Sequence, residues 1–131
     1  MKIIGHKWIE SPIFKIINNI EDINKTLAKD ILLFNDLDKN IKIIKYSNIN
    51  NLPYAIRVKD IKEAILSHNL NASYILVLPE MAKEIQDIAQ NYLFDTLVLV
   101  EINNEKEIEY YAKLGIDGII FSNSIKLPNS S

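Results

Sequence analysis

Short apolar runs alternate with amphipathic segments of helical type through the second half of the sequence, and this alternation constrains the fold most. The runs are rich in β-branched and aromatic residues, and they lie at 54–58, 74–78, 97–101 and 118–121. Strands that are apolar throughout are typical of parallel sheets buried on both faces, with helices as the crossovers. The sequence therefore predicts a three-layer α/β fold with a mainly parallel sheet of about five core strands. A half-barrel-like and a flavodoxin-like sheet both fit this pattern.

The first part of the chain has a weaker pattern. Residues 39–49 fit either a helix or a strand, and the βα rhythm on both sides favours a helix. We expect a single domain over residues 1–131. It consists of an irregular strand and helix extension at 1–29, a βα core at 30–124 and a loose tail at 125–131.

Composition restricts the partners of the chain. The formal net charge is −2, the lysines are spread along the sequence, and Arg57 is the only arginine. Because nucleic-acid binding needs a clustered basic face, we expect no nucleic-acid partner. The apolar N-terminal stretch is too short and too polar for a signal peptide, and no later run is long enough to span a membrane. We therefore expect a cytoplasmic protein with no membrane partner.

The rare residue types restrict cofactors and metals. There is no cysteine, and the two histidines, His6 and His68, are far apart and lack a ligand pattern, so we expect no metal site. We expect His68 to pack near the end of its helix rather than to act in catalysis. The three glycines do not form a Walker loop or a dinucleotide fingerprint. No cofactor is expected.

The carboxyl ends of the predicted strands carry the candidate site residues, because ligands of parallel α/β sheets bind at that edge. Lys59 and Glu101 are the candidates for acid–base catalysis. The candidate ligand-binding residues are Asp36, Arg57, Ser122 and Asn123. Polar residues at these positions can equally be strand ends or helix caps. Arg57 in particular can bind an anion, pair with Asp36 or Glu101, or lie on an exposed edge.

Residues 52–123 resemble the middle βα units of indole-3-glycerol-phosphate synthase and related phosphate-binding barrels. The resemblance rests on Val58-Lys59-Asp60-Ile61, on Leu99-Val100-Glu101-Ile102-Asn103, and on the order of Gly115 and Asn123 after an acidic helix. It implies a half-barrel-like or open-sheet relative. It also implies that Lys59 matches a general acid, Glu101 a general base and Asn123 a substrate contact.

A second resemblance is to response-regulator receivers. Residues 75–81 are similar to the receiver strand that leads into a Pro-x-Met turn, and Lys126-Leu127-Pro128 is similar to the terminal Lys-Pro. Leu78 stands at the position of the phosphoacceptor carboxylate. This resemblance therefore implies a degenerate receiver that is not phosphorylated.

Two function classes remain open from the sequence. The favoured one is a non-catalytic binding or protein-interaction module. The alternative is a small lyase- or isomerase-like enzyme that acts on an anionic or phosphorylated metabolite at the carboxyl edge. We expect either a small anionic ligand or a second copy of the chain as partner, since Trp8 and Phe14 are of the type enriched at interface cores.

Overall fold

The computed structural model describes residues 1–130. The strands are β1 (Lys2–Ile4), β2 (Phe14–Ile16), β3 (Ile31–Phe34), β4 (Tyr54–Arg57), β5 (Tyr74–Val77), β6 (Leu97–Ile102), β7 (Gly118–Phe121) and β8 (Ile125–Lys126). The helices are α1 (Ile20–Ile23), α2 (Ile41–Ile49), α3 (Ile61–Asn69), α4 (Ala82–Asn91) and α5 (Glu107–Lys113), with short 3₁₀ turns η1 (Pro79–Met81) and η2 (Ser122–Ser124).

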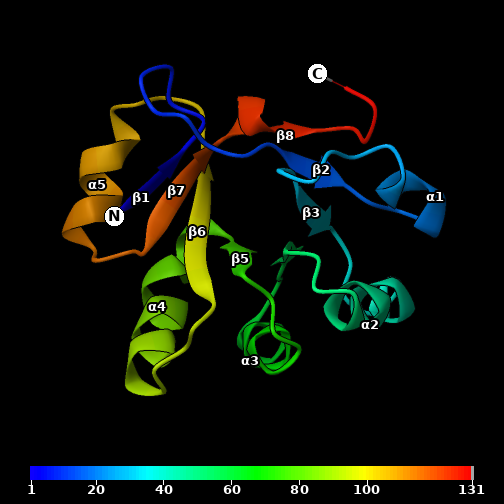
Figure 1. The fold of residues 1–131 in the computed structure, drawn as a ribbon. Coiled ribbons are helices and arrows are strands. Elements are labelled where there is room, and N and C mark those ends of the chain that lie inside the picture. The colour runs from blue at the N-terminus through cyan, green and yellow to red at the C-terminus, as the bar shows by residue number, and fades with distance from the viewer. Residues whose placement is uncertain (131) are drawn as a thin grey trace.

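The strands form one parallel sheet that curls back on itself. Their order is β1-β7-β6-β5-β4-β3-β2-β8, and every strand pair among the described residues is parallel. β7 lies next to β1 at one end of this order, and β8 lies next to β2 at the other end. In the sequence, only η2 separates β7 from β8. The helices fan around the outside of the curl (Figure 1). The predicted α/β class is confirmed, and the half-barrel-like sheet is the arrangement found.

Alternate residues of each strand face two different apolar cores, as the pleat of a strand requires. Phe34, Ile56 and Val98 belong to the outer core, which they share with helix residues such as Ala64 and Ile85. The inner core fills the concave side of the sheet. It consists of Ile4, Phe14, Ile31, Leu33, Ala55, Tyr74, Leu76, Leu99 and Ile120, and it contains no helix residue within 1–130. The inner face is therefore covered by the curl of the sheet.

The strands predicted to be central are buried, which confirms that part of the sequence analysis. Each of the following residues is at most 5% exposed: Ile75, Leu76, Val77, Val98, Leu99, Val100, Ile119 and Ile120. The segment 39–49 contains α2, as the βα rhythm predicted. α3 begins after Asp60, whose carboxylate accepts a hydrogen bond of 2.8 Å from the backbone N–H of Glu63.

The sheet also takes strands from both ends of the chain. β1 and β2 come from the predicted extension, and β8 comes from the predicted tail. On β2, Lys15 is buried, and its ammonium group donates hydrogen bonds to the carbonyl oxygens of Pro128 and Ser130. The last residue of the predicted tail, Ser131, lies outside the described residues. The division into extension, core and tail stays a prediction, but contacts across the sheet join all three segments.

Two buried tyrosines make stability depend on pH in alkali. Tyr54 donates a hydrogen bond to the carbonyl oxygen of Leu70, and burial raises its pKa above the usual 10.0. Burial, and then the negative charge of Glu107, raise the pKa of Tyr111. The unfolded chain therefore loses these protons first. Stability is expected to be constant below about pH 10 and to fall as the pH rises further.

Urea unfolding of the wild type and of Tyr54→Phe at several pH values above about 9 measures this effect. The variant cannot ionise at this position, so its stability is expected to fall less steeply with pH. Parallel pH profiles for the two proteins would contradict the assignment to Tyr54.

Candidate functional site at the carboxyl edge of the sheet

Four polar side chains lie one layer beyond the inner core, at the carboxyl ends of the strands. Each stands two residues after an inner-core residue, so the pleat directs it to the same concave side. The pairs are Leu33 and Asn35, Ala55 and Arg57, Leu99 and Glu101, and Ile120 and Ser122. We call Asn35, Arg57, Glu101 and Ser122 the polar layer. It closes the mouth of the half barrel.

Hydrogen bonds connect the polar layer across four strands. Arg57 donates from Nε to Asn35 Oδ1 at 3.0 Å and from Nη1 to Glu101 Oε1 at 3.0 Å. The hydroxyl of Ser122 donates to Glu101 Oε2 at 2.7 Å. Both carboxylate oxygens of Glu101 therefore already accept a hydrogen bond. The sequence analysis named Glu101 as one option for pairing with Arg57, and the structure shows that ion pair.

The ion pair leaves part of Arg57 available to a ligand. The side chains of Arg57 and Glu101 are 35% and 34% exposed. A guanidinium group has five N–H donors in a fixed plane, and two of them account for the bonds to Asn35 and Glu101. Planar donors of this kind suit phosphate and carboxylate oxygens. The polar layer can therefore accept an anionic group without losing its internal bonds.

The other predicted site residues do not belong to the polar layer, although Asp36 and Lys59 line a hollow together with Arg57. The Lys59 side chain is 74% exposed, and its ammonium group lies 3.5 Å from the Glu63 carboxylate. Asp36 accepts a hydrogen bond of 3.1 Å from the backbone N–H of Lys39, so it caps the turn before α2. Asn123 is exposed in the middle of η2. No hydrogen bond or ion pair within residues 1–130 joins Lys59 to Glu101, and their roles as acid and base stay predictions.

Arg57 and Lys59 line a hollow of about 140 Å³ at this edge. The hollow continues into a groove of about 610 Å³ between α2 and α3. The two share Leu37, Lys59 and Glu63. The surface thus runs without interruption from the mouth of the half barrel to the outer face of two helices.

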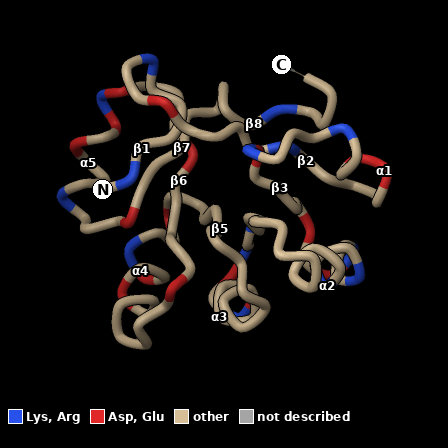
Figure 2. Tube along the Cα trace, viewed as in Figure 1, with Lys and Arg blue, Asp and Glu red and all other residues tan. Residues whose placement is uncertain are grey.

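The α2–α3 groove is a functional candidate that the sequence analysis missed. Lys45, Lys59 and Lys62 line it, together with the acidic residues Asp38 and Glu63. α2 contains no acidic residue, and both of its charged residues, Lys42 and Lys45, are lysines (Figure 2). The lysines of the groove seemed dispersed because Lys45 lies on α2, whereas Lys59 and Lys62 lie just before and on α3. No local pattern in the sequence brings these two segments together.

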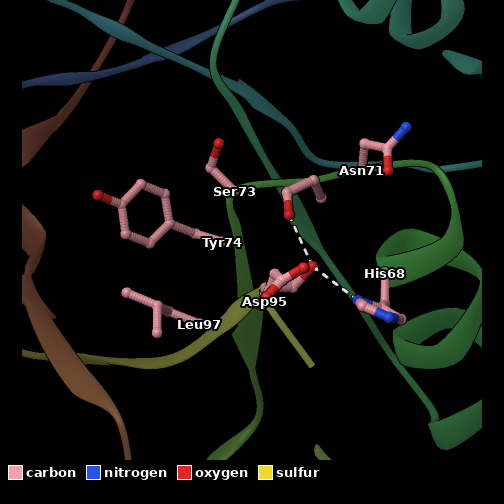
Figure 3. Close-up of a pocket in the computed structure, with 8 residues that line it drawn as sticks. His68, Asn71, Ser73, Tyr74, Asp95 and Leu97 are labelled. Carbon is pink, nitrogen blue, oxygen red and sulfur yellow. Dashed lines mark hydrogen bonds between the residues drawn. The ribbon is translucent and has the colours of Figure 1, made fainter. Parts of the chain in front are cut away.

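A second pocket of about 370 Å³ lies at the opposite, amino-terminal edge of the sheet (Figure 3). There His68 Nδ1 lies 3.3 Å from the hydroxyl of Thr96, which donates to the carbonyl oxygen of Ala72 at 2.7 Å. The His68 ring stacks on Phe94 with centroids 4.1 Å apart. These contacts hold α3 against the segment before β6, so His68 is packed as the sequence predicted. Within residues 1–130, no group of histidine, aspartate or glutamate side chains could hold a metal ion.

Comparison with known proteins gives a similarity over part of the chain. No protein-family profile matches the chain. Over 78 residues, 60% of its length, the chain is 41% identical to a ribosomal RNA small subunit methyltransferase A from Ureaplasma urealyticum. The chain spans only 26% of the length of that relative. In the part of the chain that the structure describes, no helix has the length and apolar character needed to cross a membrane.

This similarity corrects three expectations from the sequence. The relative is named as an enzyme, which contradicts the favoured interpretation as a non-catalytic binding or interaction module, and with it the leaning against an enzyme. A relative named for ribosomal RNA contradicts the exclusion of nucleic acid. The physical reason for the last error is the fold, because it brings lysines of α2 and α3 to a common groove.

Proposed function

We propose that this protein is an enzyme of the RNA methyltransferase kind, and that the α2–α3 groove and the polar layer bind its RNA. The observation that carries the proposal is the 41% identity to a ribosomal RNA methyltransferase over 78 residues. The geometry supports it, because the lysines of the groove lie near Arg57, whose guanidinium has N–H donors that the bonds to Asn35 and Glu101 do not use. In this proposal, the small anionic ligand predicted at the carboxyl edge is an RNA phosphate.

The residues at the carboxyl edge do not fit a glycine-lined cradle for a nucleoside methyl donor. Of the three glycines, Gly115 and Gly118 lie before or at the start of β7, and Gly5 follows β1. A Cβ added at Gly5 would lie 2.4 Å from the Ser124 hydroxyl oxygen, so the protein itself fills the space beside this backbone. We therefore assign RNA contacts to residues of this chain and assign none of them to the donor.

The lysines of the groove are expected to set the salt dependence of RNA binding. The test variant replaces the three lysines that line the groove, Lys45, Lys59 and Lys62, with glutamine. Loss of three phosphate contacts to single-stranded RNA is expected to reduce the slope of log affinity against log salt by about 2. Fluorescence anisotropy with a labelled single-stranded fragment of small-subunit ribosomal RNA, between about 50 and 200 mM salt, measures it.

The matched control replaces Lys2, Lys83 and Lys113 with glutamine. These lysines are exposed on β1, α4 and α5, away from the groove, and their loss changes the net charge equally. Equal salt slopes for the two triple variants would remove the groove from the proposal. Absence of methyl transfer from labelled S-adenosylmethionine to RNA that the protein does bind would contradict the enzymatic part. A cytoplasmic location, self-association and the barrel resemblance stay predictions.

A further inference from the structure

The loop between β1 and β2 displays a single exposed tryptophan on a fixed backbone. Trp8 is the only tryptophan of the chain, and it is 82% exposed. The Gly5 N–H donates to the Ser11 hydroxyl oxygen at 2.8 Å, which closes the loop, and the Ile9 N–H donates to the His6 carbonyl oxygen at 2.9 Å. A large aromatic side chain held this way in solvent contributes little to the core of the protein.

His6 connects Trp8 to the body of the protein. The backbone N–H of Trp8 donates to His6 Nδ1 at 3.1 Å. In the neutral imidazole the proton is therefore on Nε2, which lies 3.0 Å from the Glu105 carboxylate and donates to it. The His6 ring meets Trp8 edge-on at 5.1 Å and lies 5.9 Å from Phe121. Phe121 directly precedes Ser122 of the polar layer. The loop that carries Trp8 leaves the carboxyl end of β1, so it lies at the same edge of the sheet as the polar layer (Figure 1).

A positive charge accompanies the exposed ring. The ammonium group of Lys7 lies over Trp8, 5.6 Å from the ring centroid. An exposed aromatic ring beside a cation is the combination that proteins use to bind single-stranded nucleic acids, since a base stacks on the ring and the cation meets the phosphate. A protein partner or a second copy could also cover a tryptophan. Neither explains the neighbouring lysine as directly as a nucleotide phosphate does.

We propose that Trp8 and Lys7 form a stacking platform for an unpaired base of the RNA. This inference rests on the proposed function and adds the form of the substrate, which is single-stranded at this point. It also assigns different tasks to two parts of the surface. The α2–α3 groove contacts phosphates, and the platform contacts a base.

The test uses the full chain and a short single-stranded RNA carrying a fluorescent label. Stacking is expected to quench the emission of Trp8, which is the only tryptophan signal, and label anisotropy reports binding independently. Trp8→Ala is expected to weaken binding roughly 5- to 150-fold, while Trp8→Phe retains part of the affinity. An RNA of equal length whose nucleotides are abasic keeps its phosphate charges and is expected to leave the Trp8 emission unchanged.

The matched control is Tyr92→Ala, since Tyr92 is 75% exposed and follows α4 at the opposite edge of the sheet. The platform would be overturned if anisotropy shows binding while Trp8 emission is unchanged, and if Trp8→Ala and Tyr92→Ala lose equal affinity. That outcome would leave the RNA proposal standing. Absence of RNA binding by the wild type at low salt would overturn both. Trp8 emission that responds only to protein concentration would reassign the loop to self-association.

Discussion

Replacing Phe14 with alanine is expected to lower the free energy of unfolding by about 3–5 kcal/mol. Phe14 is fully buried in the inner core, where its ring lies 5.2 Å from that of Tyr74. In the sheet, Phe14 pairs with Ile31 of β3 on one side and with Ile125 of β8 on the other. Since this core is enclosed by strands with fixed pairing, the surrounding residues can relax little to fill the cavity. Urea unfolding followed by circular dichroism measures the loss.

The matched control is Ile49→Ala, because Ile49 is 79% exposed at the end of α2. This surface substitution is expected to change stability by less than about 0.5 kcal/mol. Similar losses for the two variants would show that the inner core around β2 is not closed as the structure has it.

Replacing Lys15 with alanine is the second substitution expected to destabilise the protein strongly. Lys15 and Asp30 are 5% and 4% exposed, and their charged groups lie 3.9 Å apart. Within residues 1–130, removing the lysine leaves the buried Asp30 carboxylate with the backbone N–H of Leu27, at 2.8 Å, as its one remaining donor. Loss of one partner of a buried pair costs about 3–5 kcal/mol. The carbonyl oxygens of Pro128 and Ser130 also lose their donor.

A double-mutant cycle separates the charge effect from lost packing. Lys15→Met with Asp30→Asn removes both charges, and it is expected to be more stable than Lys15→Met alone. Lys25→Ala breaks a pair in which the lysine is exposed, 3.5 Å from Asp22, and is expected to cost less than about 1 kcal/mol. If Lys15→Ala costs no more than Lys25→Ala and the cycle shows no coupling, the buried pair does not stabilise the fold.

Sequence patterns predicted those parts of the fold that neighbouring residues determine. The apolar runs became strands, and the Asp60 cap began α3, because both depend on residues close in the chain. The pairing of β1 with β7 and of β2 with β8 was not predicted. It depends on how far the sheet curls, and that is set by packing of the inner core rather than by any local pattern.

The candidate site was predicted in part for the same reason. Arg57, Glu101 and Ser122 lie at the ends of strands whose alternation is regular, and hydrogen bonds join them there. Lys59 was expected to join them, but β4 ends at Arg57 and the chain turns toward α3, so Lys59 pairs with Glu63 instead. The exposed Trp8 was interpreted only as an interface residue, since the sequence does not show the hydrogen bonds that fix its loop.

The curl of the sheet also determines the order in which this chain can fold during its synthesis. β3 to β6 pair with strands that are next in sequence, so each can join the sheet soon after it leaves the ribosome. β1 precedes β2 to β6 in the chain, but Lys2 pairs with Gly118 of β7, which is made after all of them. β1 therefore has no strand partner until β7 has been made. Closure at β1 and β8 is expected to be the final and slowest step, because these pairings join the most distant parts of the chain.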